Sequence, residues 1–199
     1  ACAPFRRLSL CNKNLVKMDT NNNDGKAKHD LLAEVCYAAK YEGESITQNH
    51  GKYQLSYPGS QICTMLARSF ADIGDIVRGR DLYRGNTKEK KKRDELKTNL
   101  KTIFRDIYNE LTTTKGVKSR YNGDETIIFL ITRRLVGRES RHSLVCYHLW
   151  CRKTDKYFRR TCSNGISETN NNCRCVNRGD VPTYFDYVPQ YLRWFEEWA

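Results

Sequence analysis

Apolar residues recur along much of the chain at the three- and four-residue spacing that places them on one face of an α-helix. Each segment with this spacing is predicted to be an amphipathic helix. Gly43 is expected to end the first of these helices, and Pro189 is expected to begin the last. The only clear strand signal lies at 126–132. The segments predicted to be helices are 29–43, 60–77, 94–111 and 189–198.

Polar segments rich in Asn, Gly and Ser separate these helices and are predicted to be exposed loops. Asn-rich tracts at 21–23 and 170–172 are typical of loop tips. The pattern as a whole predicts a mainly α fold, an irregular helical bundle with long disulfide-tied loops. The predicted loops are 19–30, 46–60, 78–88 and 163–180.

The chain has 199 residues, of which 39% are apolar and 29% charged, a composition typical of a globular protein of one or two domains. Its 35 Lys and Arg residues outnumber 23 Asp and Glu residues, which gives a net charge of +12. This excess favours an acidic partner: nucleic acid, an anionic membrane surface or a sulfated glycan. No apolar run reaches the roughly 18 residues of a spanning helix, so no membrane insertion by this segment is expected.

Nine cysteines are scattered along the chain without CxxC pairs, which favours disulfides formed in an oxidising compartment. Cys173 and Cys175, with Cys162 and His148, are an alternative metal cluster, but a CxC spacing is not that of a zinc site. Cys36 and Cys63 lie on the apolar stripes of their predicted helices, which allows either a disulfide between them or buried free thiols. The disulfide candidates are Cys2, Cys11, Cys36, Cys63, Cys162, Cys173 and Cys175.

The sequence carries no recognisable catalytic, cofactor or metal-binding motif. HExxH and GxSxG are absent, and residues 79–87 have the wrong glycine spacing, and Asn86 instead of lysine, for a phosphate-binding loop. The tripeptide at 178–180 reads Arg-Gly-Asp, which is found in integrin ligands, although a solvated loop explains it equally simply. Nucleic acid is disfavoured as a partner because the aromatic residues mostly occupy helix-core positions.

A dense run of cations begins at Lys88 and continues into the predicted helix 94–111. From Arg93 to Arg105 the cations recur at every fourth position, which makes one ridge about 18 Å long on a helix. Cations near a helix N-terminus oppose its macrodipole, so stability alone does not favour them there. A polyanion-binding ridge is therefore predicted, with a solvated helix face as the alternative. The predicted contacts are Lys88, Lys90, Lys91, Lys92, Arg93, Lys97, Lys101 and Arg105, followed by Arg6, Arg7 and Lys13.

Five long segments carry specific motifs. They are "CAPFRRLSLCNKNL" (2–15), "LLAEVCYAAKYEGESI" (31–46), "ICTMLARSFADIGDIVRGRDLY" (62–83), "DKYFRRTC" (155–162) and "VPTYFDYVPQYLRWFEEWA" (181–199). Together they resemble the alpha-class Duffy-binding-like domain, an adhesion module of the variant erythrocyte membrane proteins of Plasmodium falciparum. The resemblance covers nearly the whole chain.

This resemblance implies a disulfide-linked helical domain, without catalysis, on the surface of the infected red cell. The family's domain continues past Trp198 into a further subdomain, so residues 1–199 are expected to be its first two subdomains. Two functions follow from it. The first is adhesion to heparan sulfate or heparin on red cells or endothelium, with rosetting. The alternative is binding of an erythrocyte receptor, such as a complement receptor or blood-group antigen, with the charge only steering association. Immune evasion through variable loops is a third function class.

One segment departs from the family pattern of a Trp-Trp pair followed by Asn-Arg, Val-Trp and Ala-Ile-Thr-Cys. Back-translated with suitable synonymous codons and read one nucleotide later, residues 134–150 become "DWWDANRDTVWYAITCG", which restores that pattern. We therefore interpret about residues 127–151 as read out of frame. The shift removes Cys146 and Cys151 and creates one new cysteine, which turns nine cysteines into eight. Ordinary antigenic variation is the alternative.

Overall fold

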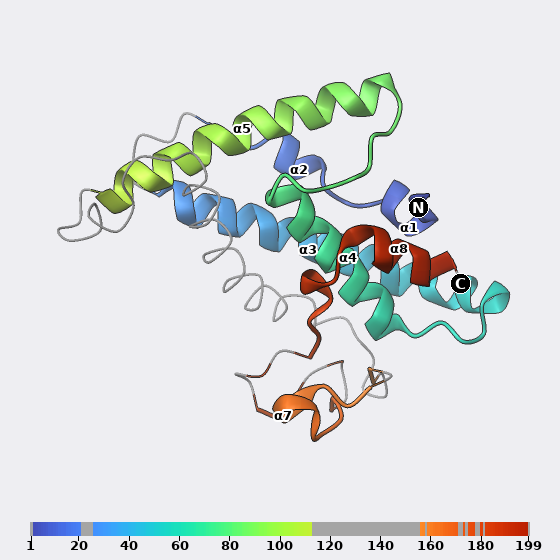
Figure 1. Cartoon of the computed structure of the whole chain (residues 1–199). Helices are drawn as coiled ribbons and strands as arrows, with labels where there is room; N and C mark the ends of the chain where they lie inside the picture. The colour runs from blue at the N-terminus through green and yellow to red at the C-terminus, as the bar shows by residue number, and fades with distance from the viewer. Residues whose placement is uncertain are drawn as a thin grey trace.

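The structure, a computed structural model, is mainly helical, as the sequence pattern predicts (Figure 1). No strand is present in the described part of the chain, and none of its helices is long and apolar enough to cross a membrane. The predicted strand at 126–132 lies outside the described residues. The structure describes residues 2–20, 26–112, 156–157, 159–170, 173, 175–177, 180 and 182–198.

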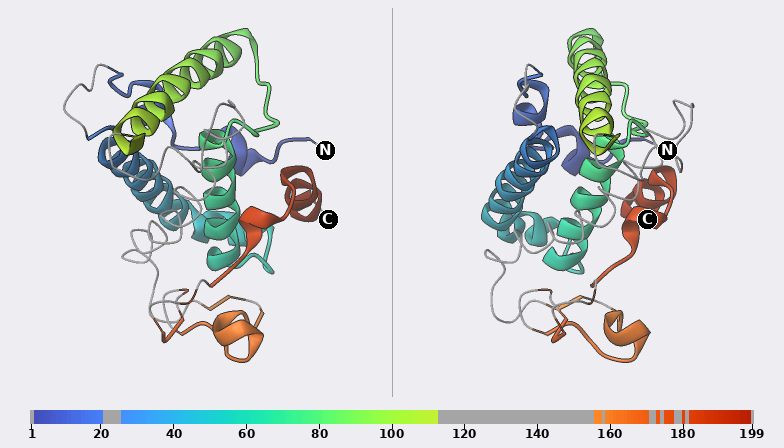
Figure 2. Two further views of the ribbon diagram at one scale, coloured as in Figure 1. Left: turned by 60° about the vertical axis from the view of Figure 1, so that its left-hand side comes forward. Right: turned by 90° about the vertical axis from the view of Figure 1, so that its left-hand side faces the viewer.

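Three long helices, α3, α4 and α5, form the centre of the bundle. Helix α3 packs against both α4 and α5, and the short helix α2 contacts α3 and α5. Helices α1 and α8 both lie against α4, so the two ends of the chain are neighbours (Figure 2). The elements are α1 (Phe5–Leu8), α2 (Lys13–Val16), α3 (Ala27–Ser56), α4 (Ile62–Val77), α5 (Thr87–Thr112), α7 (Cys162–Gly165), η3 (Phe185–Tyr187) and α8 (Gln190–Trp198).

The apolar stripes predicted from the sequence face two clusters of buried residues in the core. One cluster lies between α2, α3, α4 and α5 and contains the fully buried Leu15. It also contains Leu96 and Leu100, which lie four residues apart on the buried face of α5. The other cluster lies on the opposite half of α4 and includes Leu66 and Phe185. Full burial of one such side chain is worth about 1.5–3 kcal/mol, so these stripes hold the bundle together.

Helix α3 is longer than predicted, because it continues through Gly43 to Ser56 instead of ending near Gly43. The predicted loop at 46–60 is therefore wrong over most of its length. Ile46 and His50 lie one turn apart on the buried face of α3, and their burial outweighs the roughly 1 kcal/mol that a glycine costs inside a helix. The helix ends just before Pro58 and Gly59, residue types that favour a turn.

Helix α5 begins at Thr87, so the lysine-rich run from Lys88 is helical. The side chain of Asn86 accepts a hydrogen bond of 3.0 Å from the backbone N–H of Glu89, which is the interaction of a helix N-cap. The cap and Glu89 in the first turn offset part of the repulsion between the helix macrodipole and the lysines. The cations of this segment therefore share one rigid element with those further along α5.

The amphipathic spacing at 189–198 predicts that Leu192, Phe195 and Trp198 bury against another helix, and this prediction is wrong. Leu192, Phe195 and Trp198 are 42%, 67% and 49% exposed, whereas Arg193 and Trp194 are buried. Arg193 sets this orientation because its guanidinium binds both Asp72 and Asp75 of α4, and a buried charge pair fixes the face that a helix presents. The apolar side of α8 consequently faces outward.

Two disulfides join the loop after residue 156 to the bundle and to itself. Cys63 of α4 binds Cys173, and Cys162 binds Cys175. The disulfide between Cys36 and Cys63, one of the two alternatives that the sequence left open, is therefore not formed, since Cys63 has another partner 110 residues away. Among the described residues, Cys2 and Cys11 form no disulfide. The three cysteines of the alternative metal cluster, Cys162, Cys173 and Cys175, are all oxidised.

Candidate functional site

Arg6 and Arg7, the second group of predicted glycan contacts, are held in buried ion pairs. Arg6 donates hydrogen bonds of 3.0 and 2.9 Å to Glu197 and one of 2.8 Å to Asp72. Arg7 pairs with Asp81, and its guanidinium lies 4.6 Å from the centroid of the Tyr83 ring. Both side chains are less than a tenth exposed. Their charges are neutralised inside the protein, and we leave both out of the candidate site.

The buried charges shift one another's pKa. Burial alone would raise the pKa of Asp72, but Arg6 and Arg193 outweigh burial and hold it below its ordinary value. Burial lowers the pKa of Arg6, and Glu197 and Asp72 outweigh this and raise it. Both groups are therefore charged at neutral pH, and the cluster is an ion network that joins α1, α4 and α8.

Gln190 extends this network to the loop between α4 and α5. Its side-chain amide donates hydrogen bonds to Asp72 at 3.1 Å and to Asp81 at 2.8 Å, and its carbonyl accepts one of 2.7 Å from the backbone N–H of Leu82. Arg93 of α5 holds the same loop from the other side by donating to the carbonyl of Tyr83 at 2.7 Å. The loop is thereby fixed as one wall of a groove.

This groove, here named the α5 groove, has a volume of about 1270 Å³. One wall is the N-terminal segment with α1 and α2, another is the loop after α4, and the third is α5. Its lining comes from residues 7–17, 76–84 and 89–105, three segments that are separate in sequence. Cationic side chains outnumber carboxylates in this lining, so the groove is electropositive.

The predicted cationic ridge forms the α5 wall of the groove. Lys97, Lys101 and Arg105 line it, are exposed and form no ion pair with the carboxylates of the described residues. Two predicted contacts are partly occupied: Lys92 pairs with Glu89 at 3.1 Å, and Arg93 binds the loop carbonyl. The predicted residues Lys88, Lys90 and Lys91 are exposed at the start of α5, outside the groove lining.

Lys13 lies in the groove lining on α2, apart in sequence from the other cations. Lys17 and Arg84 also line the groove, and the sequence analysis missed both. Neither belongs to a periodic charge pattern, because Lys17 follows a four-residue helix and Arg84 lies in a loop. Only the packing of α2 and the loop against α5 brings them to one surface.

A buried hydrogen-bonded cluster forms around the carboxylate of Glu42. The carboxylate of Glu42 accepts hydrogen bonds from the backbone N–H of Cys11 at 2.9 Å and from the Ser69 hydroxyl at 2.7 Å. Burial raises the pKa of Glu42, and burial together with the Glu42 charge raises the pKa of the Cys11 thiol to about 11. A thiol with that pKa is almost wholly protonated at neutral pH and is a poor nucleophile. The cluster ties the α1–α2 connection to the bundle.

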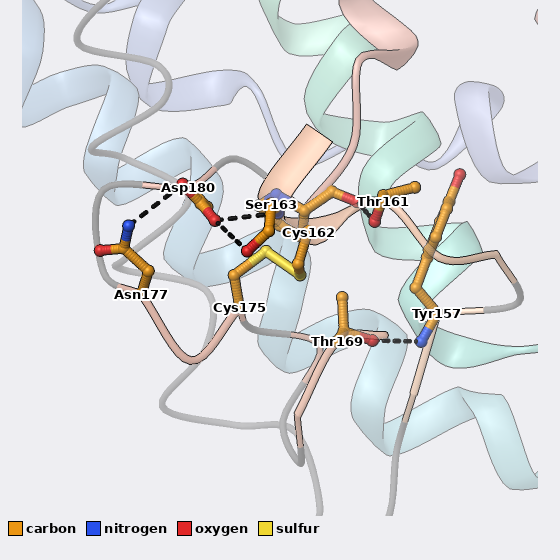
Figure 3. Close-up of a disulfide and its surroundings, with 9 residues drawn as sticks. Tyr157, Thr161, Cys162, Ser163, Thr169, Cys175, Asn177 and Asp180 are labelled. Atoms are coloured by element: carbon orange, nitrogen blue, oxygen red, sulfur yellow. Dashed lines mark hydrogen bonds between the residues drawn. A yellow bond between two sulfur atoms is a disulfide. The ribbon is translucent and has the colours of Figure 1, made fainter. Parts of the chain in front are cut away.

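The aspartate of the Arg-Gly-Asp tripeptide is engaged within its own loop (Figure 3). Asp180 accepts hydrogen bonds from the backbone N–H and hydroxyl of Ser163 at 3.0 and 3.2 Å, and from Asn177 at 3.3 Å. Beside it the Cys162–Cys175 disulfide closes the loop. These contacts engage the carboxylate inside its own loop and favour a structural role for Asp180 over an integrin site.

The described part of the chain is thus a disulfide-linked helical module whose exposed site is a cationic groove, an arrangement suited to binding. The chain belongs to the Duffy binding domain family, whose model matches residues 1–193. This confirms the resemblance found in the sequence. No curated protein matches the chain.

Solved structures agree with this family. The chain is similar to the NTS-DBL1(alpha-1) domain of Plasmodium falciparum membrane protein 1 (PfEMP1) from the varO strain, at 33% identity and a TM-score of 0.76. It is also similar to the NTS-DBL1-alpha and CIDR-gamma double domain of PfEMP1 from that strain, at 34% identity and a TM-score of 0.76. A DBLb domain of PfEMP1, solved bound to human ICAM-1, is similar to the chain at 25% identity and a TM-score of 0.65. The first two matches cover 100% of this chain, and the third covers 97%. In the same order, this chain spans only 43%, 27% and 38% of the length of the solved chains.

Proposed function

We propose that this domain is an adhesion module that binds sulfated glycans of the heparan sulfate type on host red cells or endothelium, and that it mediates rosetting. The observation that carries the proposal is the row formed by Lys97, Lys101 and Arg105. These cations lie about 6 Å apart along α5, are exposed and have no carboxylate partner in the described part of the chain. The domain acts by binding and performs no catalysis.

We also propose that the domain lies outside the infected red cell, as part of a membrane protein. Two observations support this location. The similar structures are domains of a Plasmodium falciparum membrane protein, and disulfides such as Cys63–Cys173 persist in oxidising compartments.

The affinity for a sulfated chain would come from many weak contacts. One exposed ion pair contributes about 0–1 kcal/mol, so no single cation suffices. A polyanion that meets Lys97, Lys101 and Arg105 together releases several counterions at once, and its second and later contacts form at high effective concentration. Lys88, Lys90 and Lys91 extend the same field toward the start of α5. Binding of this kind weakens steeply as salt rises.

A protein receptor is the second candidate, since one similar domain was solved in complex with human ICAM-1. The observation that favours it here is the apolar floor of the α5 groove, where Leu8 and Leu82 are half-exposed. In that case the cations would speed association without holding the partner.

A comparison of heparin with chemically desulfated heparin separates the two candidates. The purified domain is passed over both, immobilised at equal density, and the same soluble chains are added to a rosetting assay. We expect binding to heparin alone and inhibition of rosettes by heparin alone, because desulfation removes the anions and keeps the sugar backbone. Equal binding to both chains, or no binding to heparin, would overturn the glycan proposal.

A further inference from the structure

The floor of the α5 groove is apolar and partly uncovered. Leu8 of α1 and Leu82 of the loop after α4 are 50% and 53% exposed, and both line the groove. Val16 and Phe104, which are partly buried, also line the groove. A sulfated glycan does not use such a floor, because its sulfates would lose their water against apolar atoms without gaining hydrogen bonds. These side chains therefore point to a different occupant.

The dimensions of the groove fit a helix better than a small molecule. Its volume of about 1270 Å³ exceeds the range of about 300–1,000 Å³ typical of small-ligand pockets. Its α5 wall runs from Glu89 to Arg105, about 24 Å at the rise of an α-helix, which equals four to five helical turns. An amphipathic helix laid into a partly apolar groove is a recurring mode of peptide recognition, and a groove of this length accommodates several turns of such a helix.

Cations line the groove from α2, from the loop and from α5. Lys13 and Lys17 come from α2, Arg84 from the loop, and Lys97, Lys101 and Arg105 from α5. The lining also contains four carboxylates, against ten cations. Asp81 pairs with Arg7, Glu89 with Lys92 and Asp94 with Arg93, and the fourth carboxylate, Glu95, is exposed. An occupant that buries apolar side chains on the floor would therefore meet positive charge along its flanks, and charge complementarity requires acidic residues there.

We propose that the α5 groove binds an acidic amphipathic helix of a partner protein. Aliphatic side chains spaced three and four residues apart contact Leu8, Leu82 and Phe104, and carboxylates on both flanks pair with the surrounding cations. This site gives the protein-receptor candidate a specific form, in which the cations hold the partner as well as steer it. It does not depend on glycan binding, since the glycan proposal uses the cations and leaves the floor unused.

A designed peptide tests the site directly. The probe is a fluorescein-labelled, N-acetylated fourteen-residue peptide of leucine and glutamate, with its leucines on one helical face. Its control has the same composition with the leucines spread around the helix. We expect the amphipathic peptide to bind the wild-type domain at least tenfold more tightly than the control peptide. Equal binding of both peptides would show attraction by charge alone and would overturn the proposal.

Paired variants locate the binding. The double variant Leu8→Ser and Leu82→Ser removes the floor, and Leu55→Ser with Ile166→Ser removes two exposed aliphatic side chains elsewhere, at 85% and 77% exposure. The floor variant should weaken peptide binding at least tenfold, and the control variant should stay within twofold of wild type. Both should keep heparin binding within twofold, so failure of this site and failure of the glycan site give different results.

Two further readouts keep the test decisive. Circular dichroism confirms that each variant is folded, and Leu8→Gln alone, at a half-exposed position, serves if the double variant is not. Unchanged peptide binding in a folded floor variant would overturn the proposal. Sedimentation of the wild-type domain examines a second copy as the occupant: concentration-dependent dimers that the floor variant abolishes would likewise contradict a partner helix.

Discussion

Arg6 and Glu197 form a two-point ion pair, with hydrogen bonds of 3.0 and 2.9 Å, between residues 191 positions apart. The same guanidinium binds Asp72 of α4, so one side chain connects the first helix, the centre of the bundle and the last helix. Both partners of the Arg6–Glu197 pair are less than a tenth exposed. The pair therefore helps to fix the segment that forms one wall of the α5 groove.

Loss of this arginine should destabilise the fold strongly. Arg6→Ala leaves Asp72 and Glu197 without their buried partner, and breaking such a pair from one side costs about 3–5 kcal/mol. Urea unfolding followed by circular dichroism measures the change. Arg84→Ala, at an exposed position of the groove, is the control and should shift stability by about 0.5 kcal/mol or less. Equal effects of the two changes would show that the buried network is not formed.

The two tryptophans of α8 should contribute unequally to stability, because one is buried and the other is half-exposed. Trp194 is 3% exposed, so Trp194→Ala should cost about 3–5 kcal/mol. Trp198 is 49% exposed and contacts the Phe5 ring at 5.7 Å between centroids, a pair worth about 0.5–1.5 kcal/mol. Thermal unfolding of both variants checks this. A larger loss at Trp198 than at Trp194 would contradict the observed orientation of α8.

Acid should weaken the ion network through Asp72. Because the pKa of Asp72 is below its ordinary value in the folded state, its charge adds stability above about pH 4, the unfolded pKa, and this stability is lost as the pH falls through the folded pKa. Glu42 changes the stability in the opposite direction. Because burial raises its pKa in the folded state, its protonation favours the folded protein as the pH falls.

Urea unfolding at pH 7, 5 and 3 tests this linkage in wild type and in Asp72→Asn. The wild type should lose stability mainly between the last two pH values, and the variant should show a smaller loss there. The difference between the two proteins should therefore narrow as the pH falls. Parallel curves for both proteins would mean that Asp72 is not the group that responds.

The disulfides should be recovered by peptide mapping without reduction, as Cys63–Cys173 and Cys162–Cys175. In the chain-entropy model a link closing about 100 residues contributes roughly 4–5 kcal/mol and one closing about 15 residues roughly 3 kcal/mol. Replacing Cys63 and Cys173 by serine should therefore destabilise more than replacing Cys162 and Cys175. A peptide that links Cys36 to Cys63 would contradict the structure.

The frame-shift interpretation of about residues 127–151 concerns a segment outside the described residues. If the shifted frame is a sequencing error, resequencing the source DNA should give the family-like reading, and the peptide from this segment should carry a single cysteine. If the cause is a compensated pair of insertions or deletions, the DNA should contain that pair at the two ends of the segment. A single clean frame, with Cys146 and Cys151 present in the peptide, would refute it.

The sequence predicted the buried face of a helix correctly where that face follows from local apolar spacing. The prediction was wrong where ion pairs with distant residues determine which face is buried. The stripe of α4 from Ile62 to Val77 and that of α5 around Leu100 were predicted correctly, because each helix buries its most apolar face. In α8 the buried face contains Arg193, whose partners Asp72 and Asp75 lie more than a hundred residues earlier. No local pattern indicates that these charges meet.

In the candidate site, too, some residues could be predicted from local spacing and others depend on how distant segments pack. The row Lys97, Lys101 and Arg105 follows from a four-residue spacing and could be predicted. The paired state of Arg6 and the position of Lys17 could not, since both depend on how α1 and α2 pack against later helices. The groove is made of three segments and exists only in the folded chain.

The salt dependence of heparin binding in a triple variant tests the glycan site most directly. Lys97, Lys101 and Arg105 are changed together to serine, and Lys40, Lys52 and Lys156, all exposed outside the groove, are changed in a control of equal net charge. Affinity is measured from low to physiological salt. The groove variant should bind more weakly and with a slope of log affinity against log salt that is smaller by about two to three, roughly one for each lost contact, while the control keeps the wild-type slope. An unchanged slope in the groove variant, or an equal fall in both variants, would contradict a sulfated-glycan site on α5.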